Sequence, residues 1–264
     1  EQNHDFEKGL RSMDFAYNCA AYTNVDGAED NAQIAFAVNH LGVENIAKVC
    51  AKYNIPLVHM STDYVFGARA LQALKAEGGG IRTWQEQDIP APDGVYAQSK
   101  YAGEQALLKT CKKYFLIRTS WLYGSSGKNF VDTMLERGLK GQALRVVNDQ
   151  IGSPTYAGHL AEALVQLLDM SEYGIYHLTN LGEVSWYAFA CEIFKEAGLK
   201  VNLTPCSSTE YVSKAVRPAY SVLDNEHWRK LGKKPLPAWE VGLGEYLKLK
   251  QTKKMSSAAA GSRA

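Results

Sequence analysis

The segment Ile55-Pro-Leu-Val-His-Met-Ser-Thr-Asp-Tyr64 begins as a short apolar run and ends in polar and aromatic side chains. A short apolar run of this kind is typical of a strand that is buried on both faces of a sheet. Residues 31–53 before it carry apolar side chains close to the 3.6-residue repeat of a helix, and residues 96–111 after it form a second helical pattern. The segment therefore predicts a central strand between two helices.

Strand-like and helical patterns alternate along the first half of the chain. Apolar runs at 15–20 and 114–117 predict two further strands on either side of the run at 55–60. This alternation predicts an α/β fold with a Rossmann-like, doubly wound parallel sheet that is covered by helices on both faces. In such sheets ligands bind beyond the carboxyl ends of the strands, so polar segments at those ends should converge on one crevice. These segments are 18–23, 61–64 and 119–123.

Tyr96 and Lys100 lie four residues apart in the second helical pattern, which places their side chains on one face of the helix. A free tyrosine has a pKa of about 10. A neighbouring ammonium group favours the phenolate and lowers that pKa, so the pair suits proton transfer to or from a carbonyl oxygen. The spacing by itself is common. A solvated lysine beside a half-buried tyrosine is the simpler interpretation of an isolated match.

The composition excludes several classes of protein. The 264 residues are 46% hydrophobic and 22% charged, which is ordinary for a globular domain. A net charge of +1 with scattered Lys and Arg predicts no nucleic-acid partner, and no apolar run is long enough for a membrane span. Five widely spaced cysteines predict reduced, mostly buried thiols in a cytoplasmic protein. Neither the cysteines nor the six histidines show metal-ligand spacing, so we expect no metal site.

Several motifs occur in order between about residues 10 and 250. They are Asn18-Cys-Ala-Ala-Tyr-Thr-Asn-Val-Asp26, Ser61-Thr-Asp-Tyr-Val-Phe66, Tyr96-x-x-x-Lys100, Arg118-Thr-Ser-Trp-Leu-Tyr-Gly124, Asp149-Gln-Ile-Gly-Ser-Pro-Thr155, Gly174-Ile-Tyr-His177 and Arg217-Pro-Ala-Tyr-Ser221. Together they resemble the extended short-chain dehydrogenase/reductases, and most closely the dTDP-4-dehydrorhamnose reductase family. The resemblance implies reduction of the 4-keto group of a dTDP-linked 6-deoxyhexose with NADPH or NADH as cofactor, which gives dTDP-L-rhamnose.

The resemblance also implies roles for individual residues. Tyr96 would be the general acid, Lys100 would lower its pKa and bind the nicotinamide ribose, and Thr62 would hydrogen-bond the sugar oxygen. Further residues implied at the cofactor are Ala20, Ala21, Tyr22, Asn39 and Ser61. Residues implied at the nucleotide-sugar substrate are Asp63, Tyr64, Trp121, Asn129, Gln150, Ser153, Thr155 and, as a contact to the diphosphate, Arg217.

The sequence departs from this family at its start. The family opens with a strand, a glycine-rich turn and a helix that bind the cofactor pyrophosphate, and no such element precedes Asn18. Either the start is clipped or this protein has abandoned that mode of binding, and we favour the first because the residues implied in catalysis remain. The chain by itself should then bind dinucleotide poorly.

The chain is predicted to divide into three parts. Residues 1–147 should form an incomplete NAD(P)-binding domain, and residues 148–250 mainly a substrate-binding lobe, with some segments returning to the sheet. Residues 251–264 should form a disordered tail. Residues 67–94 form a glycine- and proline-containing loop that is either a lid over the site or a tolerated surface insertion.

Other functions remain open on sequence grounds. A non-catalytic nucleotide-binding subunit, similar to the regulatory partner of methionine adenosyltransferase, would tolerate loss of the glycine-rich element. A nucleotide-sugar epimerase or dehydratase is a third candidate, although the motifs at 118–121 and 149–152 favour the reductase. We also consider a homodimer.

Overall fold

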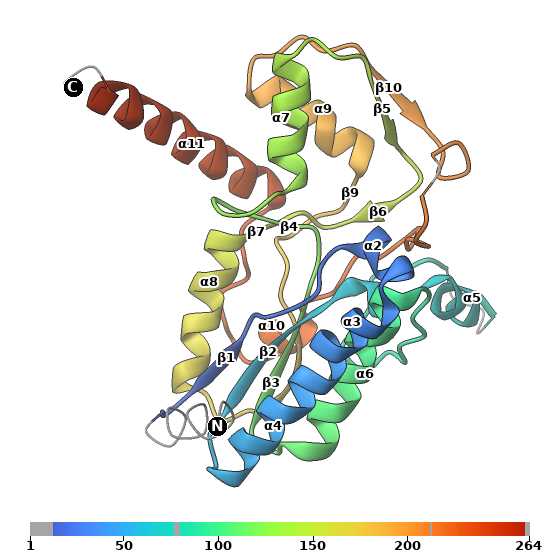
Figure 1. Cartoon of the computed structure of the whole chain (residues 1–264), viewed down its shortest axis with the longest axis vertical. Coiled ribbons are helices and arrows are strands. Elements are labelled where there is room, and N and C mark those ends of the chain that lie inside the picture. The colour runs from blue at the N-terminus through green and yellow to red at the C-terminus, as the bar shows by residue number, and fades with distance from the viewer. Residues whose placement is uncertain (1–12, 77–79, 212, 262–264) are drawn as a thin grey trace.

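The computed structural model describes residues 13–76, 80–211 and 213–261, with side chains as far as residue 252. Its centre is a parallel sheet of four strands in the order β1-β2-β3-β8 (Figure 1). Strands β2 and β3 run in register over six residue pairs, from Leu57 beside Tyr114 to Thr62 beside Thr119. The predicted parallel α/β sheet is therefore confirmed. The strand bounds are β1 (Ala16–Asn18), β2 (Leu57–Thr62), β3 (Tyr114–Thr119) and β8 (Gly174–His177).

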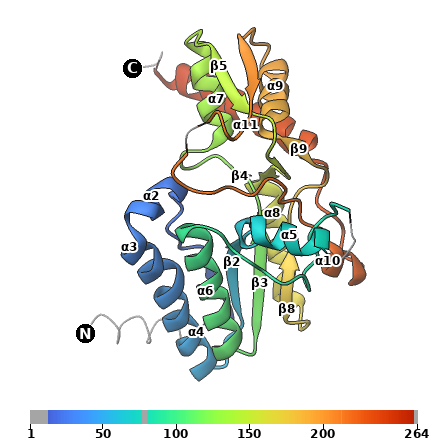
Figure 2. The same cartoon turned by 90° about the vertical axis from the view of Figure 1, so that its right-hand side faces the viewer.

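Helices cover both faces of the sheet, as Figure 2 shows. Alternate strand residues point to opposite faces, so Leu57 packs against α4 and α6 while Val58 packs against α8 and α10. Both side chains are fully buried, which explains why the apolar run showed no polar alternation. The helix bounds are α4 (Val43–Lys52), α6 (Val95–Thr110), α8 (Ala157–Val165) and α10 (Glu226–Lys230).

The predicted helix over 31–53 is interrupted by a π-helical stretch, Ala37–Gly42, between α3 (Ala32–Phe36) and α4. The stretch lies against α6 at Gly103, where an added Cβ would come within 2.1 Å of the Asn39 carbonyl oxygen. A glycine is thus required for the close approach of the two helices. Asn39 is fully buried at this contact.

A second apolar core lies above the sheet in Figure 1. It is built around α7, α9 and the parallel pair β5–β10. Because Tyr123, α7 and β5 belong to this core, it begins before the predicted division at 147/148. The cause is side-chain packing, since Val131 and Met134 face Phe189 and Ile193 rather than the sheet. The bounds are α7 (Phe130–Leu139), β5 (Leu144–Val147), α9 (Trp186–Glu196) and β10 (Leu203–Cys206).

Short elements connect the two cores. They are α2 (Val25–Asp30), β4 (Leu122–Tyr123), β6 (Ile151–Gly152), β7 (Thr155–Tyr156) and β9 (Val184–Ser185). The last helix, α11 (Trp239–Gly261), continues into the segment that we had predicted to be disordered. Alanines at 258–260 have the highest helix propensity, which outweighs the polar composition of this segment. Within the described ranges, no helix is both long enough and apolar enough to cross a membrane.

The segment 67–94 is anchored to the sheet side of the molecule. It begins with a short helix, α5 (Ala68–Ala76), and residues 77–79 are not described. Further along, Trp84 stacks on Phe66 with ring centroids 4.6 Å apart. The Trp84 indole also donates a hydrogen bond to the carbonyl of Tyr220 at 3.1 Å. These contacts favour an insertion fixed to the core over a lid.

We expect Gly103→Ala to lower the free energy of unfolding by about 1–3 kcal/mol, because the new methyl group would force α6 away from the π-helical stretch. Urea unfolding of the purified variant measures this change. Gly244→Ala in α11 is the matched control, since no heavy atom lies within 4 Å of its added Cβ. Alanine there should raise stability by up to about 1 kcal/mol. Equal effects of the two substitutions would contradict a tight contact at Gly103.

Candidate active site

The polar residues after β2 are held by a tight turn. Thr62 ends the strand in an extended conformation, and its hydroxyl accepts a hydrogen bond from the backbone N–H of Tyr64 at 3.2 Å. This contact caps the 3₁₀ turn Asp63–Val65, as serine and threonine do at helix starts. The Thr62 hydroxyl also donates to Oδ1 of Asp63 at 3.1 Å.

Tyr96 lies in the first turn of α6 and faces this turn. Its hydroxyl lies close to the Thr62 side chain, and its ring makes an edge contact with the ring of Tyr64 at 5.5 Å. Burial raises the pKa of Tyr96 to about 12, with a further increase from Asp63, and the Thr62 hydrogen bond opposes the shift. The phenol is therefore protonated at neutral pH, the form that a general acid needs.

Lys100, one turn further along α6, is only 2% exposed. Its ammonium group donates to the Met60 carbonyl oxygen at 2.6 Å. Burial lowers the pKa of Lys100 to about 8, while Glu104 and Cys19 oppose the shift. The expectation that Lys100 lowers the pKa of Tyr96 is not what this structure shows. Burial dominates the pKa of both groups, and the ammonium is directed at a backbone carbonyl.

A buried ion pair lies beneath these groups. Glu104 on α6 and Arg118 on β3 are 0% and 2% exposed, and Arg118 binds the carboxylate through two nitrogens at 3.1 and 2.8 Å. The Ser61 hydroxyl donates to Oε1 of Glu104 at 2.5 Å. The Ser61 side chain, predicted at the cofactor, thus takes part in this network. Neither Glu104 nor Arg118 was predicted, although Glu104 continues the four-residue spacing of Tyr96 and Lys100.

The residues after β1 are held in place by a side chain of the π-helical stretch. The Asn39 side chain clamps the backbone of Tyr22, accepting from its N–H at 2.8 Å and donating to its carbonyl at 3.1 Å. It also donates to the Ser99 hydroxyl on α6. Asn39 therefore shapes the segment of Ala20 and Ala21 from below, in a positioning role.

Arg217 comes from the far end of the chain and reaches the same turn. Its guanidinium forms a bidentate ion pair with Asp26 at 3.1 and 2.7 Å, and it also hydrogen-bonds the Tyr64 side chain. The bond to Arg217 holds the pKa of Asp26 at about 2. The group predicted to bind a diphosphate is thus near Tyr64, with a carboxylate as its partner.

Trp121 adopts a left-handed backbone conformation, with φ of 47°. Its ring stacks on Trp186 with centroids 3.5 Å apart, and an added Cβ at Gly152 would come within 2.5 Å of the indole. A positive φ in a bulky residue costs free energy and is concentrated at functional sites. Trp121 is therefore held rigidly between the two cores.

Four residues predicted at the substrate make hydrogen bonds within the protein, and their contact with substrate stays a prediction. Asn129 caps α7, accepting from the Asp132 N–H at 2.9 Å and donating to the Gly124 carbonyl, so its amide is fully engaged. The other three bond within or beside the loop 149–155. The partners are Ser208 Oγ for Gln150, the Gly182 carbonyl for Ser153 and the Ser153 carbonyl for Thr155. An Asn directly before a helical pattern is a capping signal that sequence reasoning missed.

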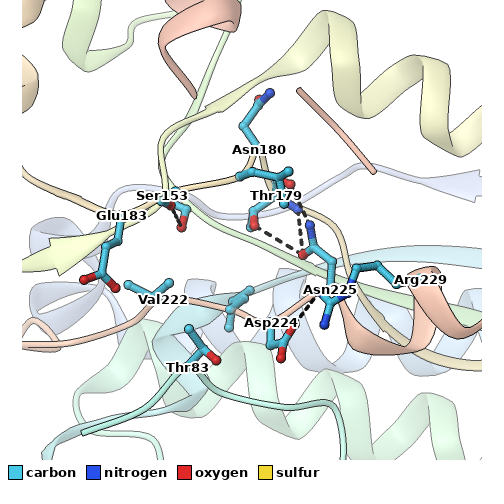
Figure 3. Close-up of a pocket in the computed structure, with 12 residues that line it drawn as sticks. Thr83, Ser153, Thr179, Asn180, Glu183, Val222, Asp224, Asn225 and Arg229 are labelled. Carbon is cyan, nitrogen blue, oxygen red and sulfur yellow. Dashed lines mark hydrogen bonds and ion pairs between the residues drawn. The ribbon is translucent and has the colours of Figure 1, made fainter. Parts of the chain in front are cut away.

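A cavity of about 330 Å³ opens beyond the carboxyl end of β8 (Figure 3). Thr179 and Asn225 lie side by side in its lining, where the Thr179 N–H and hydroxyl both donate to Asn225 Oδ1 at 3.2 Å. Arg229 and Asp224 form an ion pair at its rim. The sequence signal for this cavity is the polar pair Thr179-Asn180, one residue beyond the motif 174–177.

The residues after β1 and Lys100 have the chemistry expected beside the nicotinamide half of a dinucleotide. Ala20 and Ala21, at the carboxyl end of β1, have small side chains, and the exposed Cys19 beside them is close enough to Lys100 to oppose the lowering of its pKa. Residues 19–24, between β1 and α2, contain no glycine. Within the described part of the chain, we therefore assign no residue to binding the pyrophosphate of the dinucleotide.

Comparison with known proteins identifies the family. A profile of the RmlD substrate-binding domain matches residues 5–252. The chain belongs to the RmlD family.

Similar RmlD-type proteins include two curated relatives. A dTDP-4-dehydrorhamnose reductase of Mycobacterium tuberculosis is 41% identical over 91% of this chain and 78% of its own length. The spore coat polysaccharide biosynthesis protein SpsK of Bacillus subtilis is 41% identical over 90% of this chain and 80% of its own length.

Among solved RmlD-family structures, a dTDP-4-dehydrorhamnose reductase from Bacillus anthracis in complex with NADP superposes with a TM-score of 0.86. It is 40% identical, and the match covers 93% of this chain and 84% of that one. The expected family and fold are thereby confirmed.

Breaking the buried ion pair should be costly in this RmlD-family protein. We expect Glu104→Gln to lower the free energy of unfolding by about 3–5 kcal/mol, because it leaves the Arg118 guanidinium buried without a counter-charge. Urea unfolding measures the change. Glu136→Gln, which removes an exposed ion pair with Lys140, is the matched control and should leave stability essentially unchanged. Similar stabilities of the two variants would show that the buried pair is not required.

Proposed function

We propose that this protein is a dTDP-4-dehydrorhamnose reductase that uses NADPH or NADH to reduce dTDP-4-dehydro-6-deoxy-L-mannose to dTDP-L-rhamnose. The observation that carries the proposal is the contact between the Tyr96 and Thr62 hydroxyls at the carboxyl end of β2, within a chain of the RmlD family. The NADP complex of the Bacillus anthracis relative favours NADPH.

In this proposal Tyr96 gives its proton to the ketone oxygen, which Thr62 holds by a hydrogen bond. A reduced nicotinamide, when bound, supplies the hydride. Lys100 is charged below its pKa of about 8 and would hold the ribose, next to Ala20 and Ala21. Trp121 would offer a rigid aromatic surface to the sugar. Arg217 would release its ion pair with Asp26 and bind the diphosphate of the substrate.

The decisive experiment follows NADPH absorbance with purified protein and the dTDP-linked 4-keto sugar. We expect oxidation only when that substrate is present, and dTDP-L-rhamnose as the product by mass spectrometry and NMR. The same mixture with dTDP-glucose is the control. Absence of turnover at saturating substrate and cofactor would contradict the reductase assignment.

Tyr96→Phe should reduce kcat by roughly 10²–10⁴-fold, because it removes the proton donor and leaves the ring in place. Steady-state kinetics and urea unfolding of the variant measure the two effects separately. Tyr101→Phe, on the same helix, is the control and should keep the activity. Wild-type turnover in Tyr96→Phe would refute the acid role.

The regulatory-subunit alternative has no observation in its favour, whereas the Mycobacterium tuberculosis and Bacillus anthracis relatives are dTDP-4-dehydrorhamnose reductases. We further infer a cytoplasmic location, since none of the five cysteines is in a disulfide. A homodimer remains a prediction, which native mass spectrometry tests.

A further inference from the structure

The hydroxyl of Thr62 has three hydrogen-bonding neighbours but only one hydrogen. It accepts from the Tyr64 N–H at 3.2 Å, lies 3.1 Å from Oδ1 of Asp63, and lies close to the Tyr96 hydroxyl. A hydroxyl can donate once and accept twice. One acceptor position is filled by Tyr64, so the hydroxyl must donate to one of Tyr96 and Asp63 and accept from the other.

This constraint couples the protonation of the two acids. When the Tyr96 phenol donates to Thr62, Thr62 donates to Asp63, which then needs no proton. When Tyr96 is a phenolate, Thr62 must donate to it, and the contact with Asp63 survives as a hydrogen bond only if Asp63 carries a proton. The arrangement therefore permits a proton on Asp63 to move to Tyr96 by a single shift of each hydrogen along the chain.

Asp63 is suited to supplying that proton. Its side chain is 2% exposed, and Oδ2 makes no well-aligned hydrogen bond within the described part of the chain, although the Ser221 hydroxyl lies close to the carboxyl. Burial raises the pKa of Asp63 to about 7, which the hydrogen bonds of Ser221 and Thr62 oppose. A substantial fraction of the carboxyl is thus protonated near neutral pH.

The groups that face Asp63 come from three elements. They are Tyr64 in its own turn, Tyr96 on α6, and Ser221 on the segment that also brings Arg217 to Tyr64. Lys100 is directed elsewhere, since its ammonium donates to the Met60 carbonyl. Because the carboxyl is almost fully enclosed, a direct contact with the sugar, which we had expected from the sequence, does not suit it.

We propose that Asp63 returns to Tyr96, through the hydroxyl of Thr62, the proton that Tyr96 gives to the substrate. The inference rests on the proposed reductase function. Reduction of the ketone consumes one hydride, which forms the C–H bond, and one proton, which forms the O–H bond. Once the product alcohol has left Thr62, the Tyr96 phenolate takes the Thr62 hydrogen, Thr62 takes the Asp63 proton, and the Asp63 carboxylate regains a proton from solvent water before the next turnover.

The test compares Asp63→Asn with the wild type between pH 5.5 and 9. Asn keeps the shape and one acceptor oxygen but has no acidic proton. We expect kcat to fall by about tenfold or more, with KM little changed. The decrease of wild-type kcat should be centred near pH 7, as Asp63 loses its proton. In the variant the remaining decrease should be centred near the pKa of Lys100, about 8.

Glu86→Gln is the matched control, because Glu86 is another buried carboxyl whose pKa is raised by burial. Its Oε1 accepts from the His177 and His227 backbone N–H groups, away from the relay. This variant should keep the wild-type pH profile, and Asp63→Glu should recover part of the lost kcat. A raised KM with normal kcat in Asp63→Asn would show substrate binding instead and overturn the relay, as would an unchanged profile.

An infrared measurement makes the relay testable without turnover. The wild type and Glu86→Gln should show a protonated-carboxyl band that disappears between pH 6 and 8. Asp63→Asn should lack this band. In Tyr96→Phe the band should disappear over a different pH range. Failure of the wild type to reduce the sugar, with this titration intact, would contradict the proposed function but support the coupling. A carboxyl at Asp63 that titrates near pH 4 would overturn the relay whatever the activity.

Discussion

The geometry of the site depends on how closely α6 lies against the sheet. The ion pair of Glu104 with Arg118 joins the helix to β3 in an almost water-free layer, and the Ser61 hydroxyl adds a bond from β2. A buried pair of this kind adds little net stability over an apolar pair, but its geometry is highly directional. Gly103 fixes the other side of the same helix against the π-helical stretch.

Because α6 is fixed in this way, the positions of Tyr96 and Lys100 follow from helix geometry. The spacing of four residues places Tyr96, Lys100 and Glu104 in one row, from the open end of the crevice to the buried ion pair. Tyr96 therefore meets the turn after β2, while Lys100 lies above the backbone of β2 at Met60. The carboxylate of Glu104 also helps to keep Lys100 charged in its buried position.

Burial also sets the protonation states in the site. It raises the pKa values of Tyr96 and Asp63 and lowers that of Lys100, which is the direction expected when a charged form is taken out of water. The pattern Tyr-x-x-x-Lys alone suggested the opposite shift for the tyrosine. Pairwise reasoning from the sequence considered one neighbouring charge and could not include the loss of solvent.

The order of strands and helices and the parallel sheet were predictable from the sequence, because buried strands and amphipathic helices leave periodic apolar patterns. The turn at Thr62 and the row on α6 were also predictable, since both depend on residues close together in the chain. Only the tertiary structure decided where the second core starts, the hydrogen bond of Ser61 to Glu104, and the pairing of Arg217 with Asp26. Each of these depends on partners that are distant in sequence or on the local exclusion of water. Such contacts produce no periodic pattern in the sequence.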